Sequence, residues 1–200
     1  MKKLILMALL ICPGLLSSQA QDKKILPAEV QIRIATQAAP AESRAGAKVY
    51  GYDAAGKFIV LREGTNGYIC LGPQFNSAMY TAFCYPESLE PFMARGRALS
   101  AANKDEDKDK IREEEFKAGK LSIPQTPTTM YSYYGSANQL NPATGEMADA
   151  KRRYVIYMPY AKAADLGLSN QPNSLGSPWL MGEGTYKAHI MISPPADQKR

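Results

Sequence analysis

The first strong pattern along the chain is a series of strand-like segments between positions 47 and 71. Residues rich in Val, Ile, Phe and Tyr are interrupted by turn formers at Asp53–Gly56 and Gly64–Gly67, and the glycines of these turns supply the positive φ values that hairpins need. The pattern predicts a three-stranded antiparallel meander. Its middle strand, Phe58–Leu61, is apolar at every position, which predicts cover on both of its faces.

Two segments before and after this meander have helical character. Pro27 and the Ala-rich stretch up to Ala39 favour a short helix, although apolar and polar residues alternate from Val30 to Ile34 and leave a strand open. After Pro86, apolar residues recur at three- and four-residue steps as far as Leu99, which predicts a helix with one apolar stripe. Gly96 lies on that stripe and permits close approach of a neighbour.

A third helix is predicted over Lys104–Lys117, where charges of both signs are dense. Only Ile111 and Phe116 are clear apolar anchors, so we expect a solvated helix stabilised by pairs of opposite charge four residues apart. Gly119 is a natural stop for it.

Strand patterns return at Met130–Tyr134, Arg153–Tyr160 and Tyr186–Ser193. They are separated by turn formers, including the long stretch Gly167–Gly184, and stretches of that length are often functional or mobile. The order of strands, then helices, then strands predicts an α+β fold with an antiparallel sheet, in which the N-terminal meander and the C-terminal strands pack with two to three helices. Residues 21–200 are expected to form a single globular domain.

The N-terminal 20 residues have the features of a secretory signal peptide. Lys2 and Lys3 precede an apolar run from Leu4 to Leu16, and the small residues at positions 18 and 20 suit cleavage by signal peptidase after Ala20. The run is too short to span a membrane, and no later segment is long and apolar enough to do so. A lipid anchor at Cys12 is the alternative, but Ile11 is a poor residue before a lipidated cysteine. The protein is therefore predicted to be exported, either periplasmic or secreted.

Charge and cysteine content restrict the function further. Removal of the signal peptide lowers the formal net charge from +5 to about +3, and the basic residues are dispersed, so no nucleic-acid partner is expected. Cys70 and Cys84 remain in the mature chain, and in an oxidising compartment they are predicted to form a structural disulfide between the last strand of the meander and the start of the following helix. Two independent buried thiols are the alternative.

His189 is the single histidine of the chain, so a zinc site of the usual kind lacks ligands. Strand parity places it with Lys187 and Met191, away from Ala188, Ile190 and Ile192. A histidine on a half-exposed strand face is the simplest interpretation. A site for a soft metal such as Cu(I), formed by His189, Met191 and another methionine, is a sharper one.

Aromatic residues are concentrated in the second half of the chain and suit a ligand or protein surface, although at strand spacing they also form cross-strand pairs. The candidate ligand-binding residues are His189, Trp179, Tyr157 and Arg153. The sequence thus favours an exported ligand-binding or interaction module that needs no cofactor and whose partner is an unknown ligand or protein. The alternatives are a hydrolase that uses carboxylates with His189 as an accessory, or a copper-binding protein. Glu87 and Glu90, beside Arg95 and Arg97 at the start of the helix after Pro86, have a spacing that glycosidase carboxylates also show, but this spacing is common and favours solvated charges.

One segment also carries a family resemblance. The run Gly64-Thr65-Asn66-Gly67-Tyr68-Ile69-Cys70, together with Cys84, resembles a group of exported bacterial proteins to which no activity is assigned. The resemblance extends over most of the mature chain and implies export and a single domain.

Overall fold

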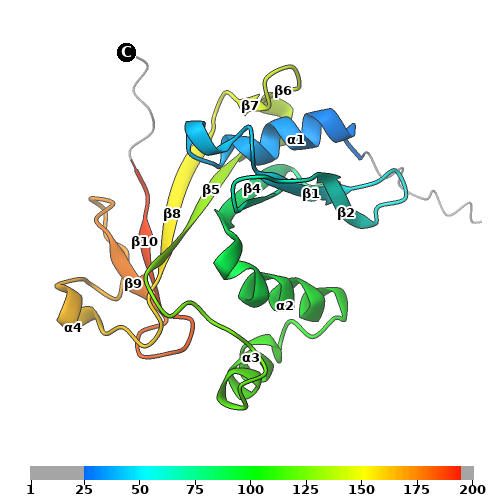
Figure 1. The fold of residues 1–200 in the computed structure, drawn as a ribbon. Coiled ribbons are helices and arrows are strands. Elements are labelled where there is room, and N and C mark those ends of the chain that lie inside the picture. Colours follow the sequence, from blue (N-terminus) through cyan, green and yellow to red (C-terminus); the bar gives the residue numbers. More distant parts are fainter. Residues whose placement is uncertain (1–24, 195–200) are drawn as a thin grey trace, which may run out of the picture.

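The computed structural model describes residues 25–194, and its centre is an eight-stranded, mostly antiparallel sheet (Figure 1). The predicted signal peptide and its cleavage site lie outside the described residues. The spatial order of the strands is β2-β1-β3-β4-β5-β8-β10-β9. Their bounds are β1 Lys48–Tyr52, β2 Phe58–Arg62, β3 Tyr68–Leu71, β4 Met79–Pro86, β5 Thr128–Ser136, β8 Lys151–Tyr157, β9 Trp179–Met181 and β10 His189–Ile192. A separate small hairpin pairs β6 (Leu140–Asn141) with β7 (Glu146–Met147).

Helices cover the two faces of the sheet unequally. The helix α1 (Ala28–Gln37) packs on one face, whereas α2 (Glu90–Ala101) and α3 (Lys108–Lys117) lie on the other (Figure 1). The four-residue α4 (Ala163–Leu166) follows β8. Three short 3-10 helices connect these elements: η1 Ala41–Ser43, η2 Glu87–Leu89 and η3 Ala137–Gln139. The described residues therefore form an α+β fold, as predicted, with four α-helices where two to three were expected.

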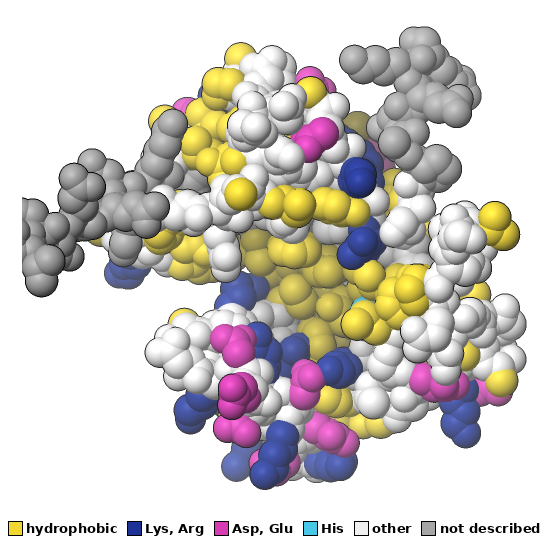
Figure 2. Space-filling view, turned by 180° about the vertical axis from the view of Figure 1, so that it is seen from behind, with side chains coloured by type: hydrophobic (Ala, Val, Ile, Leu, Met, Phe, Trp, Pro, Cys, Tyr) yellow, Lys and Arg dark blue, Asp and Glu magenta, His cyan; other side chains and the backbone are white. Residues whose placement is uncertain are grey.

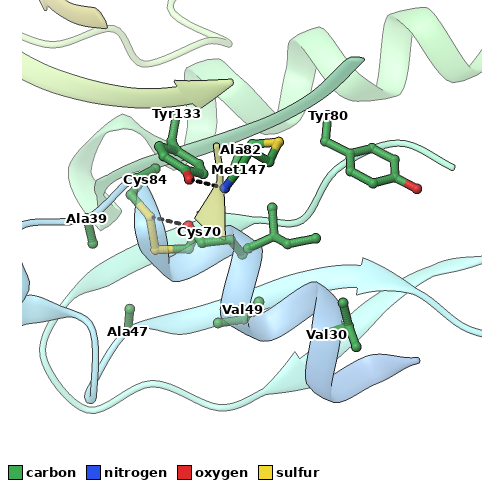
Figure 3. Close-up of a cluster of buried hydrophobic side chains, with 13 residues drawn as sticks. Val30, Ala39, Ala47, Val49, Cys70, Tyr80, Ala82, Cys84, Tyr133 and Met147 are labelled. Carbon is green, nitrogen blue, oxygen red and sulfur yellow. Dashed lines mark hydrogen bonds between the residues drawn. A yellow bond between two sulfur atoms is a disulfide. The ribbon is translucent and has the colours of Figure 1, made fainter. Parts of the chain in front are cut away.

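The core beneath α1 is formed by small and branched side chains, with Val30, Ile34 and Val49 among them (Figure 3). A buried glutamine fixes the helix to the sheet: the Gln31 amide donates to the carbonyl oxygens of Leu26 and Tyr52 at 2.7 and 2.8 Å, and its oxygen accepts from the backbone N–H of Tyr52. Because these bonds pair both N–H donors and the oxygen of the amide, its burial costs little. A second core, between the sheet and α2, includes Tyr85, Leu89 and Phe92.

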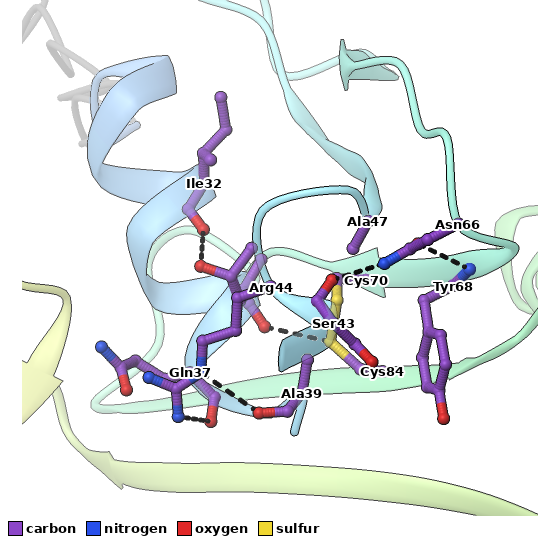
Figure 4. Close-up of a disulfide and its surroundings, with 12 residues drawn as sticks. Ile32, Gln37, Ala39, Ser43, Arg44, Ala47, Asn66, Tyr68, Cys70 and Cys84 are labelled. Carbon is purple, nitrogen blue, oxygen red and sulfur yellow. Dashed lines mark hydrogen bonds between the residues drawn. A yellow bond between two sulfur atoms is a disulfide. The ribbon is translucent and has the colours of Figure 1, made fainter. Parts of the chain in front are cut away.

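The disulfide is confirmed, but it joins two neighbouring strands. Cys70 on β3 and Cys84 on β4 stand directly opposite each other, with their sulfur atoms bonded and their Cα atoms 4.1 Å apart (Figure 4). Both residues are fully buried beneath α1, and Cys84 Sγ lies 3.3 Å from the carbonyl oxygen of Ala35. The prediction placed Cys84 just before a helix. It lies instead inside β4, a strand that was not predicted.

The predicted antiparallel meander is wrong in its pairing. The β1–β2 hairpin forms, but β3 pairs with β1, and in parallel. The strand β2 is consequently an edge strand, with Val60 37% exposed, and is not covered on both faces. Burial explains this order: β3 is buried at Ile69, Cys70 and Leu71, so it belongs in the interior of the sheet, whereas β2 is only half-buried.

The remaining elements follow the predictions more closely. The segment after Pro27 forms a helix rather than a strand, and α2, α3, β5, β8 and β10 lie within or close to the predicted ranges. Gly119 follows α3 with φ of +69°, as expected of a helix stop. The turn-rich stretch 167–184 contains the short strand β9, which was not predicted. No helix among residues 25–194 is both long and apolar enough to cross a bilayer.

Candidate ligand-binding cleft

A cleft of about 1200 Å³ opens between α2 and the face of the sheet opposite α1. Figure 2 shows it as a hollow with hydrophobic side chains on its floor and Lys and Arg side chains around it. The strands supply Tyr50, Phe58, Phe83 and Tyr157 to its lining, and α2 supplies Met93. Strand periodicity explains the floor, because alternate residues of each strand point to the same face. The volume exceeds that of most small-molecule sites, which are also mainly apolar concavities.

At one end of the cleft, an aromatic pair is capped by an arginine. Tyr50 and Phe58 stack with their ring centroids 5.3 Å apart and their planes 8° from parallel. Arg97 reaches over from α2 and places its Cζ 5.8 and 5.5 Å from the two centroids. Such contacts let the guanidinium cover apolar surface while it stays charged.

The same arginine is held by two partners beneath the helix. Its Nη2 lies 2.5 Å from a carboxylate oxygen of Glu90, and its Nη1 donates to the hydroxyl of Tyr85 at 2.7 Å. The Tyr85 hydroxyl in turn donates to Glu90 at 2.7 Å. Burial raises the pKa of Tyr85 well above its ordinary value, so the phenol remains protonated and serves as a donor. This closed network fixes Arg97 in place.

At the other end, α3 contributes a buried arginine. Arg112 is only 8% exposed, and its Cζ lies 3.5 Å from the ring centroid of Phe92. Its Nη2 donates to the carbonyl oxygen of Phe92 at 3.1 Å, whereas its buried Nε has no hydrogen-bond partner among the described residues. Burial lowers the pKa of Arg112, but a guanidinium keeps its charge at neutral pH.

His189 lines the cleft close to this end. Its Nδ1 lies 2.8 Å from the carbonyl oxygen of Lys187. Because a carbonyl can only accept, Nδ1 carries the proton, and Nε2 of the neutral ring is an acceptor. Burial lowers the pKa of His189 below its ordinary value, so the ring is neutral at pH 7. Its centroid lies 5.3 Å from that of Tyr157.

Of the four candidate residues predicted from sequence, His189 and Tyr157 line the cleft, whereas Trp179 and Arg153 do not. Trp179 lies on β9, opposite Met191 and near the sheet edge. Arg153 Cζ packs 5.5 Å from the ring centroid of Tyr134.

Sequence reasoning missed the two arginines of the cleft as binding residues. Arg97 was noted only as one of several charges near a helix start, and Arg112 belongs to a segment expected to be solvated. The stripe that contains Met93 and Gly96 was the available signal, because both residues line the cleft.

The predicted carboxylate chemistry finds no support in this cleft. Of the described residues that line it, none is Asp or Glu. Glu90 is engaged with Arg97, Glu87 is exposed outside the cleft, and Arg95 is paired with Glu115. Residues 25–194 also contain no cluster of three His, Cys, Asp or Glu residues that could hold a metal ion. The lining is therefore suited to binding by apolar, aromatic and cationic contacts.

Comparison with known proteins adds no relative: no protein-family model, no curated protein and no solved structure matches the chain. The function is therefore inferred from the residues of the cleft.

Proposed function

We propose that this protein is an exported ligand-binding module whose cleft binds a small organic molecule with an elongated apolar body. The observation that carries the proposal is the cleft itself, about 1200 Å³ in volume and lined by aromatic and methionine side chains. Met79, on its rim, is 52% exposed. Water-exposed apolar surface of this kind in a monomer often marks a binding site, and flexible methionines adapt to irregular ligands.

The chemistry of the lining favours binding over hydrolysis. A hydrolase of the predicted kind needs a carboxylate within hydrogen-bond reach of His189 or of the substrate. The described lining offers no carboxylate, and the His189 imidazole is oriented by a backbone carbonyl instead. The histidine can thus accept a hydrogen bond from a ligand.

The test is binding of a neutral apolar dye, N-phenylnaphthylamine, whose fluorescence rises on transfer from water. Ala98 is exposed on α2 and lines the cleft, so Ala98→Trp should fill part of it. We expect this variant to bind the dye at least about tenfold more weakly, a loss of roughly 1.4 kcal/mol. Ala164→Trp, at an exposed site on α4 outside the cleft, is the control and should bind like wild type. Equal binding by both variants would place the dye elsewhere.

Export is part of the same proposal and rests on the N-terminal sequence pattern, with which the disulfide is compatible. N-terminal sequencing of the protein recovered outside the cytoplasm should begin at Gln21. A mature chain that begins at a lipidated Cys12 would show anchoring instead of release.

Soft-metal binding is a second candidate function, favoured by the register of β9 and β10. Met181 lies directly opposite His189, and Met191 is two residues further along β10, so the three residues share one face of the sheet. Thioether and imidazole ligands suit Cu(I). Titration with Cu(I) held by the chelator bicinchoninate should show transfer of one ion to the protein, lost in Met181→Leu and retained in Met79→Leu. Absence of transfer to wild type would contradict this candidate.

A further inference from the structure

The cleft contains four cationic side chains, and one of them differs from the rest. Arg97 is paired with Glu90, Lys108 with Asp105, and Lys187 with Asp109. Arg112 forms no salt bridge with a described residue, although it is the most deeply buried of the four. The carboxylate of Asp109 is close enough to interact with its charge, but it is bonded to Lys187 and Tyr186. A buried charge is usually paired, because removal from water costs far more than a single neutral hydrogen bond returns.

The contacts of Arg112 leave much of its hydrogen-bonding capacity unused. A guanidinium has five N–H donors, and we find one hydrogen bond from it to the described part of the chain, to the carbonyl oxygen of Phe92. The ring of Phe92 covers one face of the group. The buried Nε is left without a partner, which is costly for a charged donor.

Glycine at position 96 leaves space beside the guanidinium of Arg112. Both Gly96 and Arg112 line the cleft, and a Cβ atom at position 96 would lie 3.5 Å from Nη1. A side chain at this position would be in van der Waals contact with Nη1. Its absence leaves room for a ligand atom beside the guanidinium.

We infer that Arg112 binds an acidic group at one end of the ligand, so that the cleft selects an amphiphile with a carboxylate head and a single apolar chain. This inference rests on the proposed ligand-binding function. Charge complementarity supports the inference, because the lining offers an unpaired cation, two paired lysines near it and no carboxylate. The apolar floor of the cleft continues from Tyr157 towards Phe58. A head group at Arg112 would leave the chain to lie along this floor. An arginine fork is well suited to a planar carboxylate.

The experiment compares two probes of equal chain length, dodecanoate and dodecanol, each measured by displacement of N-phenylnaphthylamine from the mature protein. Wild type should bind dodecanoate about ten- to a hundredfold more tightly than dodecanol, as a charge-assisted hydrogen bond in a buried site allows. Arg112→Met should lose most of this preference while its affinity for dodecanol stays within about threefold of wild type. Arg95→Met, which removes a charge on α2 outside the cleft, should retain the preference.

The outcomes separate this inference from the proposed function. The role of Arg112 alone would be overturned if wild type bound the dye and both probes without a preference for dodecanoate. The same holds if Arg112→Met kept the preference unchanged. Failure of the dye to bind at all would overturn the ligand-binding function as well. Should Arg112→Met not fold, the NMR signal of the Arg112 Nε–H in wild type decides: it should shift with dodecanoate and not with dodecanol, and an equal response to both would refute the inference.

Discussion

Reduction of the Cys70–Cys84 disulfide should destabilise the protein without unfolding it. The two cysteines are 14 positions apart, and in the chain-entropy model a closed loop of about 15 residues stabilises the folded state by about 3 kcal/mol. The strands that it joins are also hydrogen-bonded to each other, so the native arrangement of β3 and β4 does not depend on the bond. The loss is therefore expected to come mainly from the greater freedom of the unfolded chain.

The assay is urea and thermal denaturation of the oxidised protein and of protein refolded under reducing conditions, both followed by circular dichroism. A loss of about 3 kcal/mol corresponds to a fall of roughly 6–12 °C in the melting temperature of a domain of this size. A double variant, Cys70→Ala with Cys84→Ala, should be at least as destabilised as the reduced protein, because it also loses two fully buried sulfur atoms.

Two results would refute this reasoning. The first is agreement of the unfolding free energies of the two redox states to within about 0.5 kcal/mol. It would mean that the disulfide does not constrain the unfolded ensemble. Two free thiols titrated in denatured but unreduced protein, taken from its native compartment, would mean that the bond does not form there.

Three other predictions follow from local geometry and charge. Gly145→Ala should lower the free energy of unfolding by about 2–4 kcal/mol, because residue 145 has φ of +76° and a Cβ there would lie 2.5 Å from the Arg33 carbonyl carbon. Thermal unfolding measures this loss, and an unchanged melting temperature would contradict it. Glu90→Gln should lower the free energy of unfolding, measured by urea denaturation, by about 1–2 kcal/mol, since it removes the charge that faces the half-buried Arg97. An unchanged free energy would mean that this ion pair does not stabilise the fold. Because the folded pKa of His189 is lowered, the unfolded chain binds more protons just below pH 6.5 and stability should fall as the pH decreases through this region. His189→Gln should flatten that slope, and an unaltered slope would assign it to other groups.

The sequence was informative where one local rule determined the outcome. The three- and four-residue steps up to Leu99 located α2, and strand patterns located β5, β8 and β10. Strand pairing was harder, because β2 and β3 are both apolar, short and bounded by turns. Which of them becomes an edge strand depends on contacts with β4, a strand whose own pattern was not recognised.

The candidate site was likewise predicted only where local sequence patterns determine it. His189 and Tyr157 were identified because aromatic and titratable residues on strands are conspicuous. Arg112 was not, because a charge in a helix rich in both signs is normally solvated. Its burial results from the packing of α3 against α2, which places the guanidinium over Phe92, 20 positions earlier in the chain. No periodicity in the sequence reports such a contact between helices.

The most direct test of the cleft as a ligand site is NMR of isotope-labelled methionine methyl groups during titration with dodecanoate. Met79 and Met93 line the cleft, whereas Met147 is buried in the core beneath α1 and serves as an internal control. We predict saturable shifts of the Met79 and Met93 signals while the Met147 signal stays in place. Shifts confined to Met147, or no saturable shift of Met79 and Met93 at any ligand concentration below micelle formation, would contradict it.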